Sequence, residues 1–145
     1  MDALLWSMFF SVAMVVATTI IHYEFFQVIS ESVDRLKPRM SHRPLMLLVI
    51  FGVYLAHTLE VWAYALCYKF MDLINLGTLF GEAGQADFLT YLYYSTVSYT
   101  SLGLGDMFPS EGLRLLTGVE ALNGLILIGW SVSFTYLMME KLWQK

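Results

Sequence analysis

The sequence contains little charge, a single cysteine and no excess of basic residues. Only 14% of its 145 residues are charged, whereas 58% are hydrophobic, a balance that excludes an ordinary soluble domain and fits one compact membrane module. The lone Cys67 excludes a disulfide within the chain. The net charge of -4 argues against the basic patch that nucleic-acid binding needs, so we expect no nucleic-acid partner.

Three long apolar segments are each long enough to cross a membrane as a helix. The first is uncharged from Ala3 to Ile21 and is expected to continue toward Leu36; a hydrocarbon core of about 30 Å needs roughly 20 such residues. The second covers about 45–68 and the last about 113–139. The sequence therefore predicts an all-α membrane protein with three transmembrane helices, of which the first lies in an additional N-terminal unit, residues 1–37.

Basic residues concentrate between the first and second apolar segments. Half of the eight lysines and arginines lie there, namely Arg35, Lys37, Arg39 and Arg43. Because loops rich in lysine and arginine stay in the cytoplasm, we expect the N-terminus outside and the C-terminus, with Lys141 and Lys145, inside. Residues 69–87 then form an extracellular loop. On that outer side five acidic residues oppose two basic ones: Asp72, Glu82, Asp87, Asp106 and Glu111 against Lys69 and Arg114.

The second apolar segment carries an ionisable pair. His57 and Glu60 are three residues apart and share one helix face, and such groups are costly in a membrane unless they face protein or water. We interpret the pair first as a polar clamp between helices, with a proton sensor as the alternative. Metal binding is not favoured, because no further His or Cys cluster accompanies the pair. In the last segment Glu120 is expected to pair with a polar group, with His57 or Glu60 as a candidate neighbour.

A Gly-x-Gly turn follows a short helix predicted at about 88–100. That helix is too short to cross the bilayer, and it leads into residues 101–106, Ser-Leu-Gly-Leu-Gly-Asp. Alternating glycines adopt backbone angles that residues with a Cβ avoid, so that successive carbonyls can face one axis. Irregular backbone at membrane depth must be buried in protein or line a water-filled cavity. The pattern favours a re-entrant pore loop over a buried helix and turn outside the membrane.

The stretch from Tyr94 to Asp106, with Pro109 and the span that follows, resembles the pore module of the potassium channel superfamily. The resemblance extends from about Leu45 to Glu140, so that residues 38–145 are similar to one pore domain. The usual filter of the family is Thr-Val-Gly-Tyr-Gly-Asp. Gly103, Gly105 and Asp106 match this pattern unchanged. Ser101 replaces threonine, Leu102 replaces valine and Leu104 replaces tyrosine. Leucine at the tyrosine position also occurs in the second pore loop of two-pore-domain channels.

The resemblance implies a homotetramer in membrane lipid that conducts K⁺ passively, with K⁺ as its permeant ion and no organic cofactor. It places K⁺ at the carbonyls of Ser101, Leu102, Gly103 and Leu104, with Gly105 completing the filter. It assigns filter support to Tyr93, Tyr94, Thr100 and Asp106. It assigns a gating hinge to Gly124, for which close packing is an equally good explanation, and cavity-facing positions to Ile128, Val132, Ser133 and Tyr136. It implies a channel rather than an enzyme.

Two departures from the family pattern concern the rigidity of the filter. Leu104 lacks the hydroxyl with which the family tyrosine braces the filter, so that Tyr93 and Tyr94 would pack against it or bond elsewhere. Val97 stands where some members have a glutamate that pairs with the filter aspartate.

Potassium selectivity remains the expectation because the ligands are backbone carbonyls. The alternatives are a weakly selective cation channel, a non-conducting membrane interaction subunit and, least favoured, a small membrane enzyme that uses His57 and Glu60.

The sequence lacks the parts that gate many channels. It has no arginine-rich helix of the kind that senses voltage, and from the few residues after the last span we expect no fused ligand-binding domain. The additional first span is expected either to brace the outer helix or to dock a separate regulatory subunit. By analogy with small channels of this kind, the cell membrane of a prokaryote is the expected location.

Overall fold

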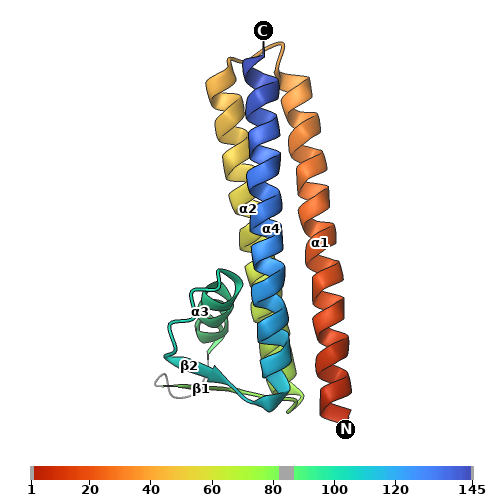
Figure 1. Cartoon of the computed structure of the whole chain (residues 1–145), viewed down its shortest axis with the longest axis vertical. Coiled ribbons are helices and arrows are strands. Elements are labelled where there is room, and N and C mark those ends of the chain that lie inside the picture. Colours follow the sequence, from red (N-terminus) through yellow and green to blue (C-terminus); the bar gives the residue numbers. More distant parts are fainter. Residues whose placement is uncertain (1, 82–86, 145) are drawn as a thin grey trace.

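The computed structural model describes residues 2–81 and 87–144, and its shape is set by three long helices. Helix α1 (Asp2–Leu36), helix α2 (His42–Leu73) and helix α4 (Glu111–Trp143) run alongside one another (Figure 1). The short helix α3 (Phe88–Tyr99) packs against α2 and α4 on the side away from α1, at the end of the bundle that holds the N-terminus. The expected all-α fold is confirmed.

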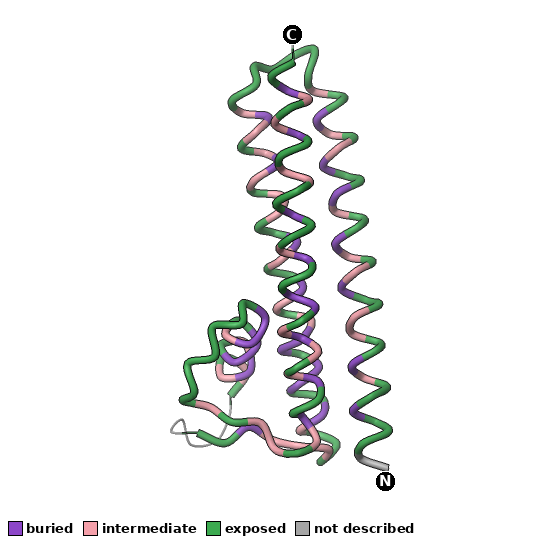
Figure 2. The backbone as a smooth tube through the Cα atoms, in the orientation of Figure 1, coloured by how far each residue is buried: buried purple, intermediate pink, exposed green. Residues whose placement is uncertain are grey.

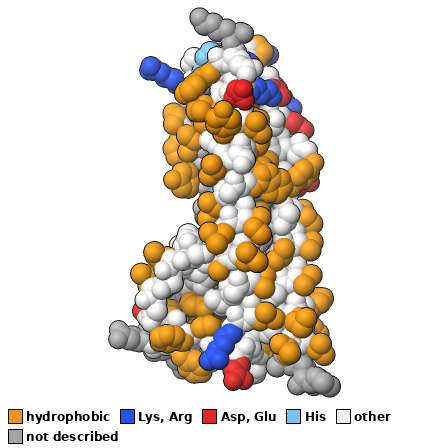
Figure 3. All heavy atoms as spheres, in the orientation of Figure 1, with side chains coloured by type: hydrophobic (Ala, Val, Ile, Leu, Met, Phe, Trp, Pro, Cys, Tyr) orange, Lys and Arg blue, Asp and Glu red, His pale blue; other side chains and the backbone are white. Residues whose placement is uncertain are grey.

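The long helices are apolar over most of their surface. Among the described residues, all three contain a stretch that is long and hydrophobic enough to cross a membrane, yet no more than 33% of any such stretch is buried inside the chain. Figure 3 shows hydrophobic side chains along the body and charged groups near its two ends. A helix that is apolar on its exposed faces needs a lipid or protein environment. Helix α1 has a continuous row of exposed apolar side chains on its outward face: Leu5, Phe9, Val12, Val16 and Ile20.

One buried seam fastens α1 to the rest of the bundle, and Figure 2 shows it as a line of buried positions along the helix. Its first half is polar and consists of Ser7, Ser11, Thr18 and His22. Its second half is apolar and consists of Phe26, Ile29 and Val33. The spacing of three, four or seven residues keeps these side chains on one helix face. Helix α1 therefore packs along both α2 and α4.

Polar contacts and close approach both occur along this seam. The Asn123 side-chain amide on α4 donates to the Thr18 hydroxyl at 2.8 Å and to the Tyr64 hydroxyl at 3.1 Å. A Cβ at Gly52 of α2 would lie 2.7 Å from the Ile29 side chain, so the glycine lets the two helices approach. Asn123 thus joins three helices through one buried amide group.

The end with the C-terminus also holds the basic connection between α1 and α2 (Figure 1). There Lys141 pairs with Asp34 at 2.6 Å, and the Lys37 ammonium donates to the Lys141 carbonyl at 2.8 Å. Both contacts are exposed, and exposed pairs contribute little stability. They place the basic cluster and the end of α4 on one side of the bundle, as the charge pattern predicts.

A two-stranded antiparallel sheet, absent from the all-α expectation, closes the other end. Strand β1 (Leu79–Gly81) pairs with strand β2 (Met107–Pro109), with Leu79 opposite Pro109. Strands this short carry no readable alternation. A Cβ at Gly81 would lie 2.7 Å from the Asp106 carbonyl oxygen, so this pairing holds β1 close to the end of segment 101–106, the predicted filter.

The helices extend further than their apolar cores. Helix α2 ends at Leu73 and α4 begins at Glu111, so the expectation of a loop beginning at Lys69 is wrong: Lys69 and Asp72 lie in α2. Hydropathy marks the part of a helix inside the hydrocarbon, whereas backbone hydrogen bonding continues into the polar ends. The expected loop acid Glu82 lies outside the described residues.

Replacing Asn123 by alanine should lower stability by about 1–2 kcal/mol. Hydrogen bonds between membrane helices average about 0.6 kcal/mol and reach about 1.7 kcal/mol each, and the substitution removes two. Thermal unfolding of the purified protein in detergent measures the loss. Leu122→Ala is the control, since the Leu122 side chain on the adjacent position is 62% exposed; equal melting temperatures for the two variants would contradict the prediction.

Candidate functional site

The short helix α3 begins at a side-chain cap. Asp87 precedes the helix, and its Oδ1 accepts hydrogen bonds from the Thr90 hydroxyl at 2.7 Å and the Thr90 backbone N–H at 2.9 Å. These bonds hold the pKa of the Asp87 carboxyl below its usual value. A charged cap at a helix N-terminus is favourable because it meets the positive end of the helix dipole. The carboxylate therefore stays ionised at neutral pH at the start of α3.

The chain turns sharply where α3 ends. The backbone N–H groups of Ser101 and Leu102 donate to the carbonyls of Ser98 and Val97 at 2.9 and 3.0 Å, and the Gly103 N–H donates to the Val97 carbonyl at 3.4 Å. The Thr100 hydroxyl donates to the Thr96 carbonyl one turn back. The first N–H groups of the predicted filter are thus directed at the end of α3.

The backbone angles alternate along the predicted filter. φ is +57° at Ser101, +55° at Gly103 and +79° at Gly105, whereas Leu102 and Leu104 between them are not in this region. A Cβ on either glycine would meet no atom of the chain within 4 Å, so backbone conformation, and not space, requires glycine there. Ser101 holds the same left-handed conformation without being glycine, which costs roughly 1–2 kcal/mol. Such strain is typical of functional segments.

The predicted filter segment lies on the surface of the single chain. Residues 100–106 are all exposed, including two large apolar side chains, Leu102 at 63% and Leu104 at 58%. The Ser101 hydroxyl reaches the Ala121 carbonyl of α4 at 3.5 Å. One side of the segment is therefore held by α3 and α4, and the other side is exposed as far as residues 2–81 and 87–144 are concerned.

A tyrosine is hydrogen-bonded to the last residue of the predicted filter segment. The Tyr93 hydroxyl donates to Asp106 Oδ2 at 2.6 Å, and this hydrogen bond raises the pKa of Tyr93 above its usual value. The contact joins α3 to Asp106. It gives Asp106 a partner although Val97 replaces the glutamate that pairs with this aspartate in some members of the superfamily. Tyr94 points elsewhere, since its hydroxyl is hydrogen-bonded to the Thr117 hydroxyl on α4 at 3.0 Å.

Glu120 joins α4 to the two helices beside it. Its carboxylate oxygens accept from the Tyr68 hydroxyl of α2 at 2.5 Å and from the Ser95 hydroxyl of α3 at 2.6 Å. All three side chains are buried. The expectation that His57 or Glu60 neighbours Glu120 is wrong, because the partner on α2 is Tyr68, about two helix turns nearer the end that holds the strands.

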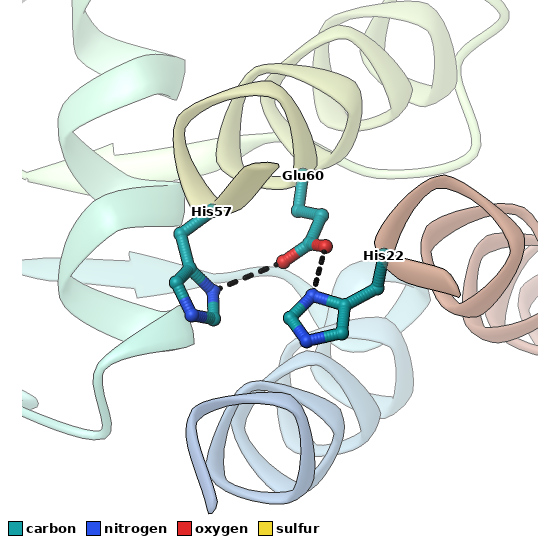
Figure 4. Close-up of side chains that lie close together, drawn as sticks. All are labelled: His22, His57 and Glu60. Carbon is teal, nitrogen blue, oxygen red and sulfur yellow. Dashed lines mark hydrogen bonds and ion pairs between the residues drawn. The ribbon is translucent and has the colours of Figure 1, made fainter. Parts of the chain in front are cut away.

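A second buried carboxylate lies deeper in the bundle (Figure 4). Glu60 lies between two histidines: Nδ1 of His22 is 2.7 Å from Oε1, and Nδ1 of His57 is 3.1 Å from Oε2. The hydroxyl of Tyr99, the last residue of α3, donates to Oε2 at 2.5 Å. His57 and Glu60 share a helix face as predicted. The expectation that no further histidine accompanies them is wrong, because α1 supplies His22.

Ser131 of α4 closes this polar cluster. Its Oγ lies 2.8 Å from Nε2 of His57 and 3.3 Å from Nε2 of His22. The cluster, defined by His22, His57, Glu60, Tyr99 and Ser131, thus receives side chains from all four helices. The sequence held a signal for His22, which follows Thr18 by one helix turn on the polar half of the α1 seam.

Gly124 lies where α4 crosses the end of α3. A Cβ there would overlap the carbonyl group of Tyr99. The structure therefore supplies a packing reason for this glycine, while its role as a gating hinge remains a prediction.

The residues predicted to face the cavity separate into two groups. Ile128 and Val132 line a hollow of about 720 Å³ between α2, α3 and α4. Ser133 and Tyr136 lie outside it and are exposed, and the Ser133 hydroxyl donates to the Gly129 carbonyl of its own helix. The hollow also includes His57, Tyr99, Thr100 and Ser131, so it connects the end of α3 with the polar cluster.

The comparisons with known proteins identify the family. A family model described as an ion channel matches residues 45–141, which is more than half of the chain and extends from α2 through α4. The chain belongs to this ion channel family. Neither a curated protein nor a solved structure matched it. Together with the three membrane-length helices, the family makes the chain a multi-pass membrane protein and an ion channel. Helix α1 lies outside the matched residues.

Replacing Gly124 by alanine should leave the channel about 1–3 kcal/mol less stable than replacing Gly118 by alanine does. Alanine favours a helix over glycine by up to about 1 kcal/mol, but the added methyl overlaps the Tyr99 carbonyl, and overpacking costs about 1–3 kcal/mol. Thermal unfolding in detergent measures the change. Gly118→Ala is the matched control on the same helix, since its Cβ would meet no atom within 4 Å. A Gly124→Ala protein as stable as Gly118→Ala would refute this packing argument.

Replacing Tyr93 by phenylalanine should shorten the time for which the channel stays conducting. The substitution removes only the hydroxyl that donates to Asp106, so the outer end of the filter loses its brace. Recordings from lipid bilayers should show currents that decay several-fold faster than those of the wild type. Tyr23→Phe controls for loss of a phenol hydroxyl, because the Tyr23 hydroxyl accepts from the Gln27 side-chain amide on its own helix, α1. Unchanged decay in Tyr93→Phe would show that the hydrogen bond does not support the filter.

Proposed function

We propose that this ion channel is a homotetrameric, potassium-selective channel that conducts K⁺ passively through the filter Ser101–Gly105. The observation that carries the proposal is the alternation of positive and negative φ along these residues. Where left-handed and right-handed residues alternate, successive peptide groups turn to the same side. Rings of backbone carbonyls arranged in this way replace the hydration shell of K⁺.

The hydrogen bonds of the segment support carbonyl ligation. The N–H groups of Ser101, Leu102 and Gly103 are directed to carbonyls at the end of α3. The carbonyls of Ser101, Leu102, Gly103 and Leu104 are the groups we assign to K⁺. Because the ligands belong to the backbone, leucine at 102 and 104 leaves the ligand set unchanged.

The electrostatics of the pore loop favour a cation. The C-terminal end of a helix carries about half a negative charge from its unpaired carbonyls, and α3 ends directly beside Ser101. At the start and end of the loop, Asp87 and Asp106 add two carboxylates. An ion in the filter therefore has negative potential at both ends of its path.

The need for several chains follows from the single pore loop. One chain supplies one strand of carbonyls, and a filter needs four such strands around an axis. In the single chain the filter side chains Leu102 and Leu104 are exposed, as is expected of a surface that other copies cover. We therefore infer four copies around the filter.

The orientation follows from the distribution of charge. The basic cluster and the C-terminus lie at one end of the bundle, and the pore loop lies at the other. With the basic end in the cytoplasm, the filter opens to the outside of a cell membrane. Helix α1, whose seam packs along α2 and α4, acts in this proposal as a brace for the outer and inner helices rather than as a dock for a separate subunit.

Ion flux through purified protein in liposomes tests the proposal. We expect K⁺ flux well above Na⁺ flux, and loss of that flux in Gly103→Ala, because alanine at φ +55° is strained by roughly 1–2 kcal/mol in each of four subunits. Gly118→Ala, which adds the same methyl group in open space on α4, should keep it.

Two results would contradict the proposal. Equal K⁺ and Na⁺ flux would indicate a weakly selective cation channel in which Leu104 fails to hold the carbonyl rings. Absence of flux over a range of pH and voltage, in protein that crosslinks as a tetramer, would indicate a non-conducting interaction subunit.

A further inference from the structure

The polar cluster inside the bundle contains a set of metal-ligating atoms that conduction does not use. His22, His57 and Glu60 each offer one ligand atom, and these atoms lie within 4.8 Å of one another. His22 and Glu60 are fully buried, and the His57 side chain is 19% exposed. The three residues come from two helices, with His22 on α1 and the other two one turn apart on α2 (Figure 4).

We propose that His22, His57 and Glu60 bind one divalent transition-metal ion of the Zn²⁺ class in each chain. Two imidazole nitrogens and a carboxylate oxygen form a ligand set that Zn²⁺ takes in proteins. Nδ1 of each histidine faces the same carboxylate, at 2.7 and 3.1 Å from its two oxygens. Tetrahedral bonds of about 2.0–2.1 Å place ligand atoms roughly 3.4 Å apart. The two nitrogen–oxygen contacts are shorter than this and all three ligand atoms lie within 4.8 Å of one another, so the side chains must rearrange slightly to admit the ion.

The groups around the ligands orient them for a metal. Nε2 of both histidines faces the hydroxyl oxygen of Ser131, at 2.8 and 3.3 Å. A serine oxygen has two acceptor lone pairs, so it can accept an N–H from each ring. In this tautomer the Nδ1 lone pair of both rings is available to a bound ion, which would replace the contacts that these atoms make with Glu60 and, from His57, with the Tyr99 hydroxyl at 2.8 Å. Metal-bound histidines are held by a second hydrogen bond of this kind.

The charge of the cluster calls for a cation. Among the described residues, the groups that contact the Glu60 carboxylate are the imidazoles of His22 and His57 and the phenol of Tyr99. None of them is a permanent cation. A carboxylate buried away from water is costly unless it is paired or coordinates a metal. One divalent ion supplies that charge, and three protein ligands leave a further position for water.

The cluster has a route to the surface through the hollow described above. His57, Tyr99 and Ser131 form part of its wall, together with the threonine hydroxyls of residues 96 and 100. An ion that enters the hollow reaches His57 first, because that side chain is the exposed member of the ligand set. Binding there would fasten α1, which lies outside the family match, to the pore module next to the last residue of α3.

Metal titration of the purified full chain tests the site. The protein, stripped with a chelator in detergent, is titrated with Co²⁺ by visible absorption and with Zn²⁺ by calorimetry. We expect one ion per chain and the intense visible bands of four-coordinate Co²⁺. His22→Ala and Glu60→Gln should each weaken binding by more than about 100-fold, beyond the 10- to 100-fold effect of outer partners. His42→Ala is the matched control: His42 is the third histidine, is exposed and begins α2.

A ligand-preserving variant separates loss of the site from loss of the fold. His22→Cys keeps a metal ligand at this position, so it should retain Co²⁺ and add a sulfur-to-cobalt charge-transfer band. The proposal is overturned if the wild-type protein binds neither Co²⁺ nor Zn²⁺. The cluster would then be a polar clamp between helices without a metal ion. The proposal is also overturned by binding that persists in both His22→Ala and Glu60→Gln, or that His42→Ala removes equally. The titration uses no flux measurement, so its outcome is independent of ion selectivity.

Discussion

The buried carboxylate of Glu60 is the group on which the arrangement of the four helices depends. Apolar helices in lipid have little reason to choose one packing over another, whereas a polar group in their midst must find its partners within the protein. Glu60 finds them on α1 and α3 as well as on its own helix, through His22, Tyr99 and His57. Ser131 adds α4. One group therefore specifies how four segments meet.

The same rule operates at two further levels of the bundle. Asn123 joins α4 to Thr18 and Tyr64, and Glu120 joins α4 to α2 and α3. Helix α3 is consequently held in its middle at the Glu120 level and at its end through Tyr99 at the Glu60 level. The exposed segment 100–106 is thus supported from one side, by α3 and α4. This combination of a held helix and an exposed segment is what the proposed assembly around a central axis requires.

Local patterns predicted most of the fold and part of the site. The hydropathy of three segments indicated three spanning helices, and the Gly-x-Gly turn indicated left-handed backbone, which Gly103 and Gly105 adopt. The helix ends were less accurate, because hydropathy reports the hydrocarbon region alone. The strand pair at Leu79–Gly81 was not predicted, since its partner lies beyond α3 and each strand has three residues. The hydrogen bond between Tyr93 and Asp106 was not predicted either, because the sequence could not decide between Tyr93 and Tyr94 as the supporting residue.

The sequence by itself determined which segments are apolar, where the chain turns and which end is basic, because these properties depend on residues that are neighbours along the chain. Tertiary structure alone decided the partners of the buried polar groups. Glu60 and His22 are 38 positions apart, and His57 and Ser131 are 74 apart. Their contact depends on the angle and spacing at which separate helices pack. That geometry follows from side chains along the entire seam, from Ser7 to Val33, and no local pattern contains it.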